Sequence, residues 1–78
     1  MNWKTIRNIY YNVFIHNYTI EYLGEDKYKL TNWYKNGQKS WTAEHKNGIL
    51  HGKFIGWNTN GQKAWEEDYK DGIFIYQT

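Results

Sequence analysis

The chain repeats itself at a spacing of 24 residues, and this repeat constrains its fold more than any other feature. The segment from Trp33 to Trp41 aligns with Trp57 to Trp65, and Lys46-Asn47-Gly48-Ile49 aligns with Lys70-Asp71-Gly72-Ile73. Self-similarity at a fixed period indicates duplicated local structure. The same supersecondary unit is therefore expected twice.

The repeat also indicates how the 78 residues are organised. Residues 27–77 hold two 24-residue hairpin repeats, and residues 1–23 are expected to form a degenerate N-terminal cap. A chain of this length supports one small hydrophobic core. We therefore expect residues 1–78 to form a single domain.

Four Asn-Gly or Asp-Gly dipeptides punctuate the repeats. They are Asn36-Gly37, Asn47-Gly48, Asn60-Gly61 and Asp71-Gly72. Such dipeptides supply the two positive-φ positions of a type I′ turn, whose twist matches that of the flanking strands. We therefore predict a two-residue hairpin turn at each. The strands between these turns are expected at residues 27–35, 38–46, 49–59, 62–70 and 73–77.

The fold class that follows is all-β, a single antiparallel β-meander of repeated hairpins. Aromatic residues make up 21% of the chain and proline is absent, a bias that favours sheets. Ile9–Ile15 and Tyr18–Leu23 also look extended, which would bring the meander to seven strands. If this end were helical instead, Trp3, Ile6 and Tyr10 would share one face. The N-terminal segment then either extends the sheet or covers it.

Two-residue turns fix which residues face one another across the strands. The predicted pairs on one face are Leu30 with Ala43, Asn32 with Trp41, Trp41 with Phe54, His45 with Leu50, Gly56 with Trp65, Gly52 with Tyr69, and Tyr69 with Phe74. An aromatic ring opposite a strand glycine covers otherwise bare backbone. We therefore expect this face to be apolar and to need a cover, for which a second copy of the chain is the simplest alternative to the N-terminal segment.

The opposite face carries charge pairs at equivalent positions of the two repeats. The predicted register sets Lys29 against Glu44 and Lys53 against Asp68. Apolar side chains also lie on this face, more than a monomer normally exposes. They are Trp33, Trp57, Ile49, Ile55, Ile73 and Ile75.

The repeat unit resembles a known family. An aromatic residue, Asn-Gly, Gln-Lys, a second aromatic and then Lys-Asn/Asp-Gly, followed by Leu50-His51-Gly52-Lys53, is similar to the MORN-repeat-variant motif over about residues 28–76. The resemblance implies short hairpins of about this length. It also implies an interaction scaffold, because MORN-like proteins generally have this role. Variant-repeat proteins are often described as antitoxin-like.

Residues suited to catalysis or to binding a cofactor are scarce. The chain has one serine, no cysteine and three histidines, and the predicted register puts Ser40 and His45 on opposite faces. A metal site needs three or four converging ligands, and neither His51 nor His45 has enough of them nearby. No glycine-rich loop precedes a helix, as phosphate binding would require. We therefore expect no enzyme, no cofactor and no metal.

Composition also bounds the cellular setting. The absence of cysteine is compatible with a reducing compartment, and no apolar run approaches the roughly 20 residues that a membrane span requires. We expect a cytoplasmic protein without a membrane partner. The net charge is +2, and the basic residues are scattered among acidic ones rather than clustered. This pattern gives only weak support to nucleic-acid binding.

The presence of Trp33 and Trp57 is the sequence feature that the needs of a folded core explain least. The repeat places them identically beside Asn-Gly turns, and tryptophan contributes strongly at interfaces. We expect a small inhibitor or antitoxin-like protein, such as a phage or mobile-element anti-defence inhibitor, that occludes a protein partner. The alternative is a nucleic-acid-binding module that uses aromatic stacking and Lys or Arg contacts to phosphate. The residues expected to bind the partner are Trp33, Trp57, Tyr34, Lys35, Lys39, His51, Lys53 and Ile55.

Overall fold

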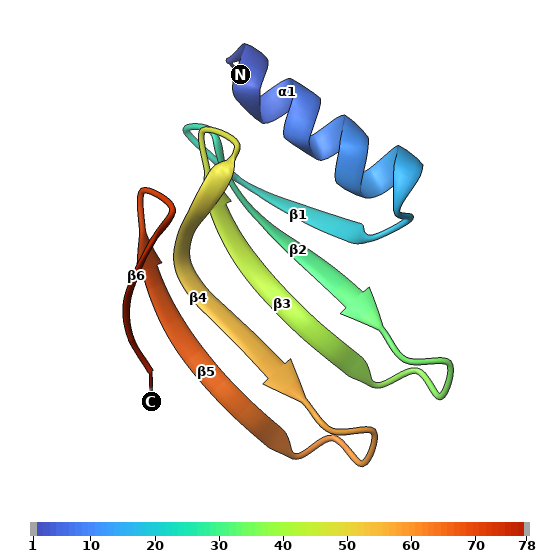
Figure 1. Cartoon of the computed structure of the whole chain (residues 1–78). Coiled ribbons are helices and arrows are strands. Elements are labelled where there is room, and N and C mark those ends of the chain that lie inside the picture. The colour runs from blue at the N-terminus through green and yellow to red at the C-terminus, as the bar shows by residue number, and fades with distance from the viewer. Residues whose placement is uncertain (1, 78) are drawn as a thin grey trace.

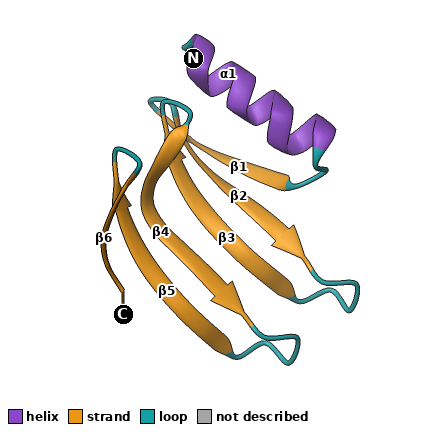
Figure 2. Cartoon of the chain, in the orientation of Figure 1, coloured by secondary structure: helices purple, strands orange, loops and turns teal. Residues whose placement is uncertain are grey.

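The computed structural model describes residues 2–77, which form one antiparallel sheet of six strands preceded by a helical segment (Figures 1 and 2). Spatial order follows chain order, so the sheet is a meander and the all-β prediction is confirmed. The strands are β1 (Thr19–Gly24), β2 (Lys27–Trp33), β3 (Lys39–Lys46), β4 (Ile49–Trp57), β5 (Lys63–Lys70) and β6 (Ile73–Gln77).

The N-terminal segment is helical. Helix α1 (Trp3–Tyr10) continues into a π-helical turn at Tyr11–Ile15. Extended structure over Ile9–Ile15 was therefore a wrong prediction, and the described meander has six strands rather than seven. The side chain of Asn2 accepts a hydrogen bond from the N–H of Thr5 at 2.9 Å, which caps the helix start.

The helix lies over part of the apolar face of the sheet. Tyr28, Leu30 and Ala43 on this face are the buried hydrophobic residues of the described chain. The hydroxyl of Tyr28 donates a hydrogen bond to the side chain of Asn8. In Figure 1 the helix stands beside β1 and β2, and β4 to β6 have no helix over them. The core is therefore confined to one half of the sheet.

The four predicted turns divide into two kinds. Asn47-Gly48 and Asp71-Gly72 are two-residue turns with positive φ at both positions, as predicted. At Asn36-Gly37 and Asn60-Gly61 only the glycine has positive φ, at 89° and 90°. In both, the glycine N–H bonds back three residues, to Tyr34 and Asn58, which makes a three-residue loop with a glycine bulge. The two-residue prediction was wrong at these two turns.

The longer loops leave the register of the strands unchanged. Trp33 pairs with Lys39, yet Asn32 pairs with Trp41, so Ser40 is an extra residue in β3. The extra loop residue is absorbed by this bulge directly beside the turn. One repeat later Trp57 pairs with Lys63 and Gly56 pairs with Trp65, so Ala64 is the extra residue in β5. The pairs predicted in the strand bodies therefore form despite the different turn.

A larger irregularity lies between β3 and β4. His45 pairs with Leu50 as predicted, but Ala43 pairs with Phe54 and Trp41 with Gly56. The predicted pair of Trp41 with Phe54 was therefore wrong. Three residues of β4, centred on Gly52, oppose the single residue Glu44. Because the shift is two residues, every side chain keeps the face that the uniform register assigned to it.

This shift places Gly56 between two tryptophans. Gly56 pairs with Trp41 on one side and with Trp65 on the other. A Cβ built on Gly56 would overlap the ring of Trp65, so the indole lies directly on the glycine backbone. The glycine is required here for space, since its φ lies outside the left-handed region.

Gly56→Ala tests this packing. We expect it to lower the free energy of unfolding by about 1–3 kcal/mol, since the methyl group has no room beneath the ring. In a Trp65→Ala background the same change should cost much less. Urea unfolding of the four proteins of this cycle measures both effects. An equal cost in the two backgrounds would contradict the packing.

Candidate functional site

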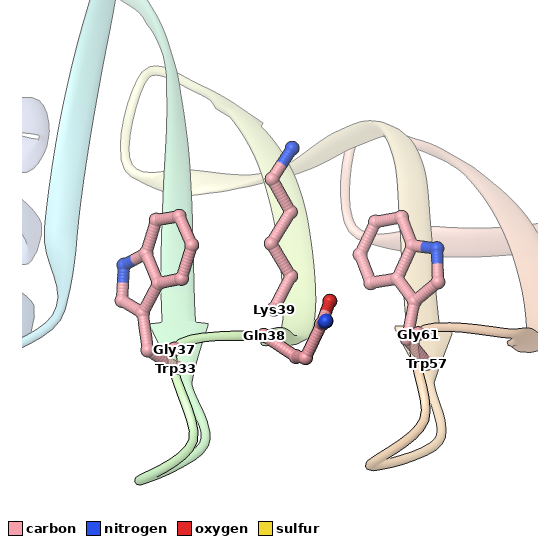
Figure 3. A pocket seen from close by; sticks show the side chains of 6 residues that line it. All are labelled: Trp33, Gly37, Gln38, Lys39, Trp57 and Gly61. Carbon is pink, nitrogen blue, oxygen red and sulfur yellow. The ribbon is translucent and has the colours of Figure 1, made fainter.

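Trp33, Lys39 and Trp57 come together at one end of the sheet (Figure 3). Trp33 ends β2, Trp57 ends β4, and Lys39 begins β3 between them. The Lys39 ammonium lies 5.7 Å from the centre of the Trp57 ring, within the range of a cation–π contact. Trp33 is 46% exposed and Trp57 is half-buried. We call this group the indole slot.

The indole slot is a shallow cavity of about 280 Å³. Its remaining lining consists of Gly37, Gln38 and Gly61. Both glycines belong to the three-residue loops, and space around Gly37 is open. Figure 3 shows the two indoles on either side of the Lys39 side chain, rising from equivalent places in the two loops. The slot therefore follows directly from the sequence repeat.

Hydrogen bonds between the two loops hold the indoles in place. The hydroxyl of Tyr34 donates to the carbonyl of Trp57 at 2.7 Å, and the side-chain amide of Asn36 donates to the carbonyl of Thr59 at 2.8 Å. On the other side, the Trp33 indole N–H donates to the hydroxyl of Thr19 in β1 at 2.9 Å. The separation of the two rings is therefore set by the framework before any partner binds.

A compact charge cluster lies beside the slot on the same face. The Lys53 ammonium is 2.9 Å from Glu66 and 2.9 Å from Asp68, and Lys63 is 2.6 Å from Glu66. Hydrogen bonds from Lys63 and then Lys53 lower the pKa of Glu66 to about 2. Hydrogen bonds to Glu66 and Asp68 raise the pKa of Lys53 above its usual value. Two lysines of this face are thus already matched by acids.

The other residues expected to bind a partner are more dispersed. Lys35 is exposed in the loop after β2, and Ile55 is half-buried between Thr42 and Glu66. His51 lies near the opposite end of β4, six residues from Trp57, which is about 20 Å along a strand. Its Nδ1 accepts a hydrogen bond from the backbone N–H of Asp71 at 3.2 Å. His51 is therefore not part of the slot.

The contacts add detail at two further residues of the slot region. The hydroxyl of Tyr34, one of the residues expected to bind a partner, donates a hydrogen bond to the carbonyl of Trp57. Gln38 lines the slot and was not singled out. Its place just after the Asn-Gly dipeptide, matched by Gln62 one repeat later, was the available signal. The outward face of α1 was also missed as a surface, although the spacing of Trp3, Ile6 and Tyr10 was visible.

Comparisons with family models, with characterised proteins and with solved structures give no match to this chain. The similarity to MORN-repeat-variant proteins stays a prediction. Among residues 2–77, no helix has the length and apolar character needed to cross a membrane. Within the same range, no three acidic or histidine side chains gather as a metal site would require.

Glu66→Gln tests the charge cluster. The pKa of Glu66 in the folded chain, about 2, is below its ordinary value of 4.5, so its contribution to stability is present above pH 4.5 and is lost as the pH falls toward 2. We expect the variant to lose less stability than the wild type over this range, as measured by urea unfolding at a series of pH values. Lys63→Met should weaken the pH dependence in the same direction. Parallel pH profiles for all three proteins would contradict the assignment.

Proposed function

We propose that this chain is a small, non-enzymatic binding protein that occludes a protein partner through the indole slot. The observation that carries the proposal is the pair of bonds from Tyr34 and Asn36, which fix the exposed indole of Trp33 and the half-buried indole of Trp57 on either side of Lys39. Rigid aromatic side chains lose little conformational freedom on binding, so such a surface binds more tightly than a mobile one of equal area.

The charges near the slot favour a protein over a nucleic acid. Phosphate binding draws on several unneutralised cations, and affinity rises with their number. Lys53 and Lys63 are both matched by Glu66 or Asp68, which leaves Lys35 and Lys39 as the available ammonium groups of the slot region. An apolar segment with one acidic or carbonyl group for Lys39 fits this surface better than a chain of phosphates.

The type of partner follows from the size of the site. A slot of about 280 Å³ is smaller than most small-molecule sites, yet two indoles beside a cation suffice as the centre of a protein interface. An inhibitor or antitoxin works by such stoichiometric coverage, and the MORN-like repeat pattern supports this role. A phage or mobile-element anti-defence inhibitor is one case within it.

Replacing both indoles tests the proposal. We expect Trp33→Ala/Trp57→Ala to lose about 100-fold or more in affinity, since interface tryptophans often contribute about 2 kcal/mol each and about 1.4 kcal/mol corresponds to tenfold. Proteins captured from host lysate on immobilised wild type and variant would be compared by quantitative mass spectrometry. Ile73→Ala is the matched control, since this side chain is 69% exposed and pairs with Lys70, on the same face at the far edge of the sheet.

Two outcomes would contradict the proposal. One is a captured protein that is retained equally by the wild type and the double variant. The other is capture that nuclease treatment abolishes and that falls steeply with salt, which would identify a nucleic acid as the ligand. Circular dichroism of the double variant confirms that any loss of capture is not due to unfolding.

A further inference from the structure

The outward face of the helix is apolar. Trp3, Ile6, Tyr10 and Phe14 lie along it and are 67%, 39%, 58% and 72% exposed. The inward face carries polar residues, of which Thr5 is fully buried and Asn8 bonds to Tyr28. A helix that covers a sheet in a monomer normally has the opposite arrangement. The outward face is therefore suited to a further contact.

A second apolar surface adjoins the first. The apolar face of the sheet continues beyond the helix as a group of aromatic side chains, in which Phe54 is in tilted or edge-to-face contact with Trp41, Trp65 and Tyr69, and Tyr69 with Phe74. We call it the aromatic row, and its members are Trp41, Phe54, Trp65, Tyr69 and Phe74. Phe74 is 49% exposed and the others are partly exposed. No helix covers this half of the sheet in Figure 1.

The two surfaces together form a step. The helix stands beside β1 and β2, while β4 to β6, which carry most of the aromatic row, have no helix over them. A helix is about 10 Å in diameter, so the two surfaces differ in height by about this amount. We propose that a second copy of this chain covers both surfaces in a two-fold homodimer. In it the outward face of each helix lies on the partner's aromatic row. The two-fold axis creates two identical contacts, because each protomer contributes one helix and one aromatic row.

Charge is complementary between the two surfaces. Arg7 lines a cavity of about 630 Å³ on the outward face with Trp3, Ile6, Tyr10, Tyr11 and Ile15. No acidic side chain pairs with Arg7 in the part of the chain that the structure describes, and residues 1–20 contain no Asp or Glu. Glu67 lies on the face of the aromatic row, where its carboxylate accepts a hydrogen bond from the Tyr69 hydroxyl at 3.1 Å. Arg7 therefore meets the partner's Glu67.

The area is sufficient for a stable dimer. A whole aromatic residue has about 200 Å² of surface. With this value, the exposed fractions of the side chains on the helix and in the aromatic row correspond to an accessible apolar area on the order of 800 Å² per protomer. A standard interface buries about 800 Å² on each partner, whereas the largest patch of a monomer is about 300–600 Å². Among residues 2–75, whose side chains the structure describes, the buried hydrophobic side chains are Tyr28, Leu30 and Ala43. A second copy that covers the apolar surfaces therefore enlarges a small core.

An anionic membrane is the competing occupant, since Lys4 and Arg7 accompany the apolar helix face. A helix lying in a lipid surface would leave the aromatic row uncovered. A second copy accounts for both surfaces and for the charge of Glu67. The homodimer does not depend on the proposed function, because the indole slot lies on the opposite face of the sheet. Trp33→Ala/Trp57→Ala should therefore leave dimerisation unchanged.

Charge reversal tests the proposal by sedimentation velocity over a range of concentrations. We expect the wild type to be a dimer, and Arg7→Glu and Glu67→Arg each to dimerise at least tenfold more weakly, because both contacts of the dimer then join like charges. An equimolar mixture of the two variants should dimerise again, since each contact of the mixed dimer joins an arginine to a carboxylate. Lys70→Glu, an exposed lysine on the other face, should remain dimeric as the matched control.

Three results would overturn the homodimer. They are a wild type that stays monomeric up to its solubility limit, a mixture of Arg7→Glu and Glu67→Arg that stays monomeric, and a monomer that binds phosphatidylserine vesicles through the helix. Phe14→Ser provides a second route to the monomer, because this side chain is 72% exposed and its loss should not unfold the chain. If Phe14→Ser dimerises as strongly as the wild type, the helix is not at the interface.

Discussion

The backbone N–H of Lys53 donates a hydrogen bond to the carboxylate of Glu44 at 2.7 Å, and this bond spans the irregularity between β3 and β4. It occupies the β3–β4 bulge, where Gly52 has a φ of 113° and a Cβ would overlap the Glu44 carboxylate. The bulge moves the pairing by two residues. As a result Gly56, rather than Phe54, comes to lie opposite Trp41.

Side-chain alternation along the strands separates the two faces by chemistry, and the two-residue displacement preserves this separation. On one face Gly56 lies between the two indoles, each of which packs edge to face on Phe54, and the resulting aromatic surface extends past the helix. On the other face the strand ends carry Trp33 and Trp57 beside matched lysine–acid clusters. One face therefore offers a continuous apolar surface, and the other offers two isolated rings in a charged setting.

The sequence predicted the strands, the faces and the indole positions because each depends on local rules. Asn-Gly dipeptides mark reversals, and side chains alternate along a strand. It did not predict the β3–β4 bulge, because the Glu44 carboxylate that satisfies the Lys53 N–H is distant in sequence. It missed the turn at Glu25-Asp26, where positive φ occurs without glycine. The helix was left open, since the residues that cap and bury it, such as Asn2 and Tyr28, lie outside its apolar pattern.

Backbone contacts measured by nuclear magnetic resonance distinguish the two-residue shift between β3 and β4 from a uniform register. The uniform register would place Trp41 opposite Phe54, whereas the bulged register places it opposite Gly56. We expect a nuclear Overhauser effect across the two strands between the backbones of Trp41 and Gly56, and another between those of Ala43 and Phe54. Cross-strand effects joining Trp41 to Phe54 and Ala43 to Gly52 would show that the strands pair in the uniform register, without the bulge.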